Sequence, residues 1–230
     1  MEIKKNDKFT VTIEDMGEDG AGIGRVDGYI WFVKDALIGD TIEASAMKMK
    51  KNYGFARLVR VITPAKGRVE AKCPVARACG GCQLQALSYE KQLEFKADKV
   101  RGHLERIGGF ANLPMEPIIG MKDPFHYRNK AQFPVGRNRD GKIVTGFYAG
   151  RTHSIIENRD CVLGVPQNRE ILDRVIDYME TYDISPYDEV TGKGLIRHIF
   201  TRYGYHTGEI MLCIVANGSR LPHQQELGKA

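Results

Sequence analysis

The sequence of 230 residues has one tryptophan and no apolar run that approaches the ~20 residues of a membrane-spanning helix. Its N-terminus, Met1-Glu2-Ile3-Lys4-Lys5, runs straight into charged residues and lacks the features of a secretory signal. We therefore expect a cytoplasmic protein without a membrane segment. No charge of one sign dominates, because 34 Lys and Arg residues face 29 Asp and Glu residues. The resulting net charge of +5 permits an anionic partner.

Cysteine is also scarce, and its five copies are unevenly spaced. Three of them form a C-x5-C-x2-C motif, Cys73-Pro74-Val75-Ala76-Arg77-Ala78-Cys79-Gly80-Gly81-Cys82, in a loop that proline and glycine break up. A disulfide framework is typical of secreted proteins, whereas thiolates bind zinc and iron–sulfur clusters. Cys161 ends a polar, loop-like run and is a candidate fourth ligand, while Cys213 lies in an apolar segment and is predicted to be a buried strand residue.

The spacing of the cysteines leaves the metal open. Structural zinc sites usually combine two C-x2-4-C knuckles, and only Cys79 and Cys82 form one here. This slightly favours an iron–sulfur cluster over zinc. The predicted metal ligands in either case are Cys73, Cys79, Cys82 and Cys161.

Residues 1–63 are predicted to form a small, OB-like β-barrel. Short segments with the two-residue period of strands recur here and are separated by glycine turns: 9–13, 29–33, 40–44 and 53–62. The glycine-rich segment 17–24 is predicted to be a loop that connects strands. It does not contain the G-x-G-x-x-G spacing of a dinucleotide-binding turn, and no helix follows it.

Residues 68–230 are predicted to form an α+β unit with a mostly antiparallel sheet, so the chain as a whole is of mixed class. Ser88 is expected to cap a helix over 88–108. Its apolar residues fall on one stripe, namely Leu93, Ala97, Val100, Leu104 and Ile107. Strands are expected near 127–137, 142–149 and 152–157, a second helix after Pro166, and a final hairpin over 195–215.

Two segments of the barrel, Gly20-Ala21-Gly22-Ile23-Gly24-Arg25 and Val33-Lys34-Asp35-Ala36-Leu37-Ile38-Gly39-Asp40, resemble a TRAM domain, a small RNA-binding barrel. A TRAM domain followed by C-x5-C-x2-C resembles the RNA (uracil-5-)-methyltransferases. The match continues through segments 79–85, 127–130 and 194–199. The resemblance implies a [4Fe-4S] cluster on the four cysteines, S-adenosylmethionine as methyl donor, and RNA, with 23S rRNA expected, as the partner.

The resemblance also implies a missing part. In the family, the nucleophilic cysteine, the catalytic glutamate and the S-adenosylmethionine site lie on a Rossmann-like domain, and no segment here has its pattern. We therefore expect an N-terminal, RNA-recognising portion with no catalytic residue and no activity by itself. The family packs helix 88–108 largely on that domain, so self-association through its apolar stripe is expected. The alternative is a stand-alone RNA-binding module that zinc or a cluster stabilises.

Basic and aromatic residues interleave in the second unit, which is the mixture that neutralises phosphates and stacks unpaired bases. At least half of these aromatic residues are expected to be buried, and a structural role for His198 is as plausible as an RNA contact. The predicted RNA-binding residues of both units are Lys48, Lys50, Lys51, Arg57, Tyr127, Arg128, Lys130, Phe133, Arg137, Arg151, Arg197 and His198.

Overall fold

The structure, a computed structural model, describes residues 3–228, which fold into two compact units. Unit 1 comprises Cys82–Gly120 together with the described part of residues 1–72, and unit 2 comprises Cys73–Gly81 and the described part of 121–230. The loop that carries Cys73 and Cys79 therefore belongs to unit 2, whereas the helix that follows it belongs to unit 1. Among the described residues, no helix combines the length and apolarity needed to cross a membrane.

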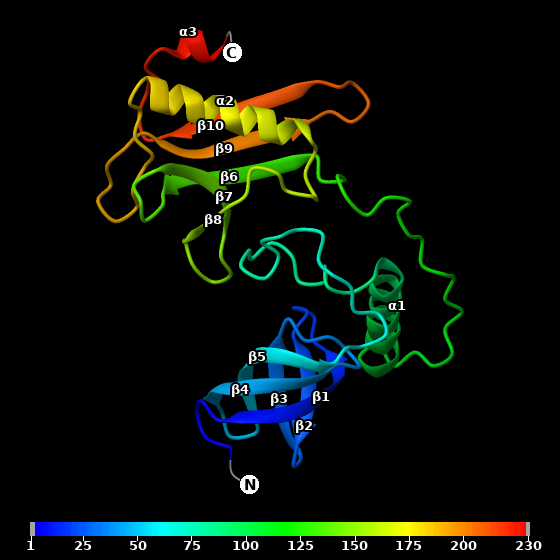
Figure 1. Ribbon diagram of the computed structural model, residues 1–230. Helices are drawn as coiled ribbons and strands as arrows, with labels where there is room; N and C mark the ends of the chain where they lie inside the picture. Colours follow the sequence, from blue (N-terminus) through cyan, green and yellow to red (C-terminus); the bar gives the residue numbers. More distant parts are fainter. Residues whose placement is uncertain (1–2, 229–230) are drawn as a thin grey trace. The chain divides into compact units, whose positions relative to one another are not determined.

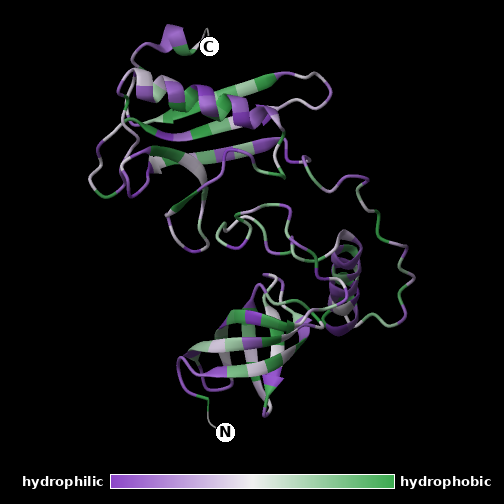
Figure 2. Ribbon diagram, in the orientation of Figure 1, coloured by the Kyte–Doolittle hydropathy of each residue, from purple (hydrophilic) through white to green (hydrophobic). Residues whose placement is uncertain are grey.

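Unit 1 contains the predicted barrel. Five strands close it in the order β1-β2-β3-β5-β4: β1 (Lys8–Met16), β2 (Gly22–Val26), β3 (Tyr29–Lys34), β4 (Thr41–Met49) and β5 (Tyr53–Thr63). Figure 2 shows polar and apolar residues alternating along these strands, as expected when one face is buried. Since β2 begins at Gly22, the last three residues of the predicted glycine-rich loop belong to a strand instead.

Trp31 fills the barrel and is 1% exposed. Its ring needs a glycine opposite it, because a Cβ on Gly54 would lie 2.6 Å from the indole. The core around it consists of alanines and branched aliphatic residues, namely Val11, Ile13, Val33, Ala36, Ile42, Ala44, Ala46, Ala56 and Leu58. The alternation that predicts the strands thus also selects the barrel interior.

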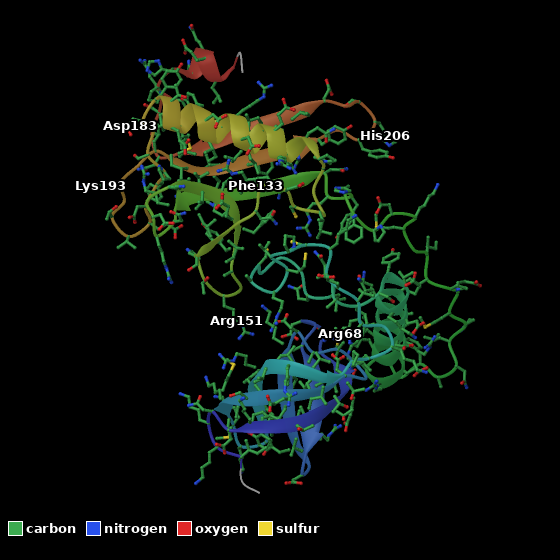
Figure 3. The ribbon with its side chains drawn as sticks, in the orientation of Figure 1. Arg68, Phe133, Arg151, Asp183, Lys193 and His206 are labelled. Carbon is green, nitrogen blue, oxygen red and sulfur yellow. The ribbon has the colours of Figure 1, made fainter. Side chains whose placement is uncertain are left out.

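A buried carboxylate joins the barrel to the segment that follows it. Asp40 is fully buried and accepts hydrogen bonds from the backbone N–H groups of Leu37 (2.7 Å) and Ala65 (2.9 Å) and from Arg68 Nε (2.9 Å). Burial alone would raise the pKa of Asp40, but these hydrogen bonds and the Arg68 charge together hold it below its ordinary value. Figure 3 labels Arg68, which lies beyond the last barrel strand.

Helix α1 (Tyr89–Arg106) begins as predicted, because Ser88 Oγ accepts a hydrogen bond from the Lys91 N–H at 3.4 Å. None of its residues is buried. Phe95 packs against a small cluster of Met16, Leu37 and Leu87, and Lys99 pairs with Asp15 of β1 at 3.6 Å. On the predicted apolar stripe, Val100 is 52% and Ile107 81% exposed, so α1 leaves much of this stripe uncovered within unit 1.

Unit 2 is a five-stranded sheet with one long helix. The strand order is β10-β9-β6-β7-β8, from β6 (Lys130–Arg137), β7 (Ile143–Tyr148), β8 (Ile155–Glu157), β9 (Ile196–Tyr203) and β10 (Ile210–Ala216), all paired antiparallel. Helix α2 (Gln167–Thr181) lies across one face of the sheet (Figure 1). The short helix α3 (Gln224–Leu227) follows β10. Leu172, Ile176 and Met179 of α2 pack on Phe133, Ile196 and Ile199 of the sheet.

The prediction that Cys213 is buried is wrong, because its side chain is exposed. Strand β10 is an edge strand and, among the described residues, pairs only with β9. Ile210, Met211, Leu212 and Val215 of the same strand are exposed as well, and Figure 2 shows β10 as mostly hydrophobic. An apolar run predicts a strand but not whether its outer edge is covered.

Candidate nucleic-acid interface and cysteine loop

The loop with Cys73 and Cys79 is held against the end of β7. The N–H of Gly80 donates to Tyr148 O at 3.0 Å, and the backbones of Cys79 and Ala149 pair in an isolated antiparallel β-bridge. A side chain at Gly80 would not fit, because its Cβ would lie 2.9 Å from the backbone of Gly150. Glycine in the motif therefore lets two backbone segments approach closely.

This docking brings three of the predicted ligands together within unit 2. Cys73 and Cys79 are each 6% exposed. Burial raises the pKa of the Cys73 thiol, and the nearby thiols of Cys161 and Cys79 raise it further. Cys82 follows Cys79 by three residues and is grouped with unit 1.

Polar N–H groups surround these sulfurs. The N–H of Gly81 donates to Cys79 Sγ at 3.4 Å, Gln85 Nε2 donates to Cys82 Sγ at 3.2 Å, and Asn158 Nδ2 lies 3.8 Å from Cys73 Sγ. Such donors stabilise thiolate over thiol, and hydrogen bonds to sulfur tune iron–sulfur centres. Within residues 3–228, however, no group of three or more His, Cys, Asp or Glu side chains is arranged to hold a single metal ion.

The sheet face opposite α2 carries an aromatic ring beside two cations. Thr201 donates to Asn168 of α2 at 2.7 Å, so it faces the helix, and its neighbours Phe200 and Arg202 face the other side. Lys130 Nζ lies 5.4 Å and Arg202 Cζ 5.9 Å from the centre of the half-buried Phe200 ring. Such an arrangement can stack a base and bind its phosphates. We name Phe200, Lys130 and Arg202 the Phe200 platform.

Lys130 is among the predicted RNA-binding residues, whereas Phe200 and Arg202 are not. The two predicted residues of strand β9, Arg197 and His198, lie in the segment 194–199 that carries the family resemblance. The alternation along the strand could have found Phe200 and Arg202: Ile199 and Thr201 are buried, so Phe200, which lies between them, and Arg202, which follows Thr201, face the opposite side of the sheet.

The predicted RNA-binding residues lie in both units. In unit 1, Lys48, Lys50, Lys51 and Arg57 are exposed, and Lys50 and Lys51 line a cavity of about 430 Å³ with Tyr29 and Trp31. In unit 2, the exposed residues are Tyr127, Arg128, Lys130, Arg137 and Arg151. Figure 3 shows Arg151 at the turn between β7 and β8.

The prediction that Phe133 contacts RNA is wrong. Its side chain is 1% exposed, and its ring packs 5.1 Å from that of Phe147 in the core under α2. Burial removes it from any surface that could stack a base.

Arg197 and His198 are partly engaged within the protein. Arg197 lies over the Tyr187 ring at 4.5 Å and pairs with Glu189 at 3.6 Å. Burial and the neighbouring Arg197 charge lower the pKa of His198, which therefore favours its neutral form. A neutral histidine is a weak partner for phosphate but still a hydrogen-bonding group.

Comparison with known proteins identifies the class of the first unit. Residues 4–59, which include the whole of β1 to β4, match the TRAM domain family. The TRAM resemblance inferred from the segments at 20–25 and 33–40 is thereby confirmed.

Over the whole chain, the similarity is to RNA methyltransferases. An uncharacterized RNA methyltransferase of Halalkalibacterium halodurans is 44% identical over 225 residues, which cover 98% of this chain and 49% of the relative. One from Listeria monocytogenes is 42% identical over the same shares. The crystal structure of Pyrococcus abyssi tRNA (uracil-54, C5)-methyltransferase in complex with S-adenosyl-L-homocysteine matches with a TM-score of 0.69 and 25% identity, over 94% of this chain and 48% of that one. The chain spans about half the length of the curated relatives it matches.

Proposed function

We propose that this chain is the RNA-recognition portion of an S-adenosylmethionine-dependent methyltransferase that makes 5-methyluridine in RNA. The TRAM match and the RNA methyltransferase relatives support the RNA partner. The solved neighbour methylates C5 of a uracil and was crystallised with the demethylated form of the methyl donor. We further propose that the catalytic groups and the donor site lie in the half of the relatives' length that this chain does not span, and we expect the chain alone to transfer no methyl group.

The Phe200 platform carries this proposal. An aromatic ring on an open sheet face offers a surface for one unpaired base, and the two cations beside it neutralise phosphates without selecting a sequence. The exposed lysines of the barrel, Lys48, Lys50 and Lys51, add a second basic surface. Measuring RNA affinity against salt, with variants of both surfaces, tests the proposal as described in the Discussion.

The RNA itself is proposed to be 23S rRNA. The solved neighbour acts on tRNA, so the two candidates need a direct comparison. A fragment of 23S rRNA that contains unpaired uridines should compete for the chain more strongly than an unmodified tRNA at equal concentration. Stronger competition by the tRNA would assign the chain to tRNA instead.

We also propose that Cys73, Cys79, Cys82 and Cys161 bind a [4Fe-4S] cluster. The clustering of three thiols in unit 2 and the N–H donors to the sulfurs fit a centre held by thiolates. A cluster with four irons offers separated ligand positions, whereas one metal ion requires its ligands to converge on a point.

Replacing Cys161 with serine is expected to remove most of the iron and sulfide that bind to the chain, because the cluster loses one of its four ligands. Cys213→Ser is the matched control, since Cys213 is exposed on the edge strand and should retain full iron content. Iron and sulfide assays on anaerobically purified protein measure both variants. Equal iron in the Cys161→Ser protein and the parent would exclude Cys161 as a ligand. If the parent is colourless and contains zinc, the metal at this site is zinc and not an iron–sulfur cluster.

Self-association through α1 is a further proposal. Its stripe leaves Val100 and Ile107 largely in water, and burying each such side chain is worth about 1.5–3 kcal/mol. We expect the sedimentation coefficient of the chain to rise with concentration, and a Leu93→Glu/Leu104→Glu variant to remain monomeric. Lys96→Glu/Arg101→Glu, two changes on the polar face of α1, is the control. A parent that stays monomeric at every concentration would show that the stripe makes no such contact.

A further inference from the structure

Strand β6 has a neighbour on one side only along part of its length. On one side it pairs with β9 from Lys130 to Pro134. On the other side the ladder with β7 begins at Val135, and the nearest upstream pairing is the bridge between Arg128 and Gly164. In the part of the chain that the structure describes, no strand covers this side of β6 between the two pairings. We name this gap, at Lys130 and Gln132, the β6 notch.

The backbone groups at the notch point into it. The N–H of Tyr203 donates to Asn129 O at 2.8 Å, so residue 129 faces β9. Backbone groups alternate in direction along a strand, and those of Lys130 and Gln132 therefore face away from β9. Two contacts on that side agree: the Arg128 N–H donates to Leu163 O at 2.8 Å, and Pro134 O accepts from Thr145 Oγ1 at 2.9 Å.

The notch opens into a cavity. It has a volume of about 560 Å³ and is lined by Arg128, Asn129, Lys130, Ala131, Gln132 and Phe147. Small-molecule sites in proteins span about 300–1,000 Å³, so this cavity has room for a nucleobase. The half-buried Phe147 ring is fixed by its contact with Phe133, and the exposed Arg128 and Lys130 supply positive charge.

We propose that the β6 notch binds one unpaired RNA base. A strand edge presents an N–H donor beside a C=O acceptor, and the edge of every nucleobase presents the complementary pair of groups. Phe147 gives the base an aromatic wall, and Arg128 and Lys130 bind the phosphates on either side. This inference rests on the proposed RNA recognition and adds the position at which a base, rather than the backbone, is held.

Replacing Gln132 with proline tests the role of the backbone. Proline removes the N–H that faces the notch and leaves the ladder with β9 intact, because that amide points away from β9. Pro134 already occupies an equivalent position in β6. Gln132→Ala is the matched control, because it removes the side chain and keeps the N–H. With an oligouridine of about ten nucleotides, we expect Gln132→Pro to bind roughly tenfold more weakly than Gln132→Ala.

An oligomer of ribose phosphates without bases should bind both variants equally. If the two variants bind oligouridine with equal affinity, the proposal that the β6 notch binds a base is contradicted, while RNA recognition by the chain is not. A parent chain that binds neither oligomer would overturn the proposed function itself.

A second measurement uses the unaltered chain and does not depend on the folding of a variant. Irradiation of a complex with 4-thiouridine-labelled RNA should attach the RNA within residues 128–132 or at Phe147. Attachment only elsewhere would contradict the proposal.

Discussion

Asp40→Ala is expected to destabilise unit 1 by about 3–5 kcal/mol, the cost of breaking a buried ion pair by removing one partner. Arg68 would lose its carboxylate, and the N–H groups of Leu37 and Ala65 would lose their acceptor. These groups join the turn before β4 to the segment after β5, so the barrel should lose its closure. The midpoint of urea unfolding, followed by the fluorescence of Trp31, measures the effect.

Glu14→Ala is the matched control, since it removes a surface carboxylate that pairs with Arg25 and should cost less than about 1 kcal/mol. Lowering the pH should destabilise unit 1 in the same way as Asp40→Ala does. The pKa of Asp40 is held below its ordinary value of 3.8, so its contribution is present above that value and is lost as the pH falls through the lower, folded-state pKa. If Asp40→Ala and Glu14→Ala unfold at the same urea concentration, the buried network does not stabilise the barrel.

The second large effect concerns the Phe200 platform. Phe200→Leu keeps an apolar residue in β9 but removes the aromatic face, and a stacked base is worth about 1–3 kcal/mol. We therefore expect single-stranded RNA to bind roughly 5- to 150-fold more weakly, without a change in the salt dependence of binding. Tyr205→Leu is the control, because Tyr205 is an exposed aromatic residue in the turn between β9 and β10. Equal losses in the two variants would show that stacking is not localised on the platform.

The lysines of the barrel, unlike Phe200, should affect the salt dependence of RNA binding. Replacing Lys48, Lys50 and Lys51 together with alanine removes phosphate contacts, and each contact contributes a slope of about 0.7 in log affinity against log salt. Three lost contacts should therefore lower the slope by about 2 and weaken all RNA sequences alike. An unchanged slope would place the phosphates elsewhere on the chain.

Local patterns predicted most of the fold. The strands of the barrel, the cap at Ser88 and the helix after Pro166 were all expected from periodicity and capping residues, because these signals act within a few residues. The strand in the glycine-rich segment was missed because Gly22 and Gly24 are selected by close packing. Their Cβ positions would lie 2.6 Å from Ala36 O and 2.4 Å from Thr12 O, contacts that depend on distant strands.

The candidate site was harder to predict, because it depends on which face and which edge of the sheet remain open. Phe133 and Phe200 both lie in amphipathic strands, yet α2 covers the first and leaves the second accessible. Cys213 was misplaced for the same reason, since strand order is a tertiary property. The cysteine motif, in contrast, was visible from spacing, because Cys73, Cys79 and Cys82 lie within ten residues of the sequence.

The dependence of RNA affinity on salt is the most direct test of RNA recognition by this chain. Fluorescence anisotropy with a labelled single-stranded RNA, repeated from low to physiological salt, measures it. Six contacted phosphates, for example, would give a straight line in log affinity against log salt with a slope near −4. Undetectable binding at low salt, or an affinity that does not change with salt, would contradict RNA recognition.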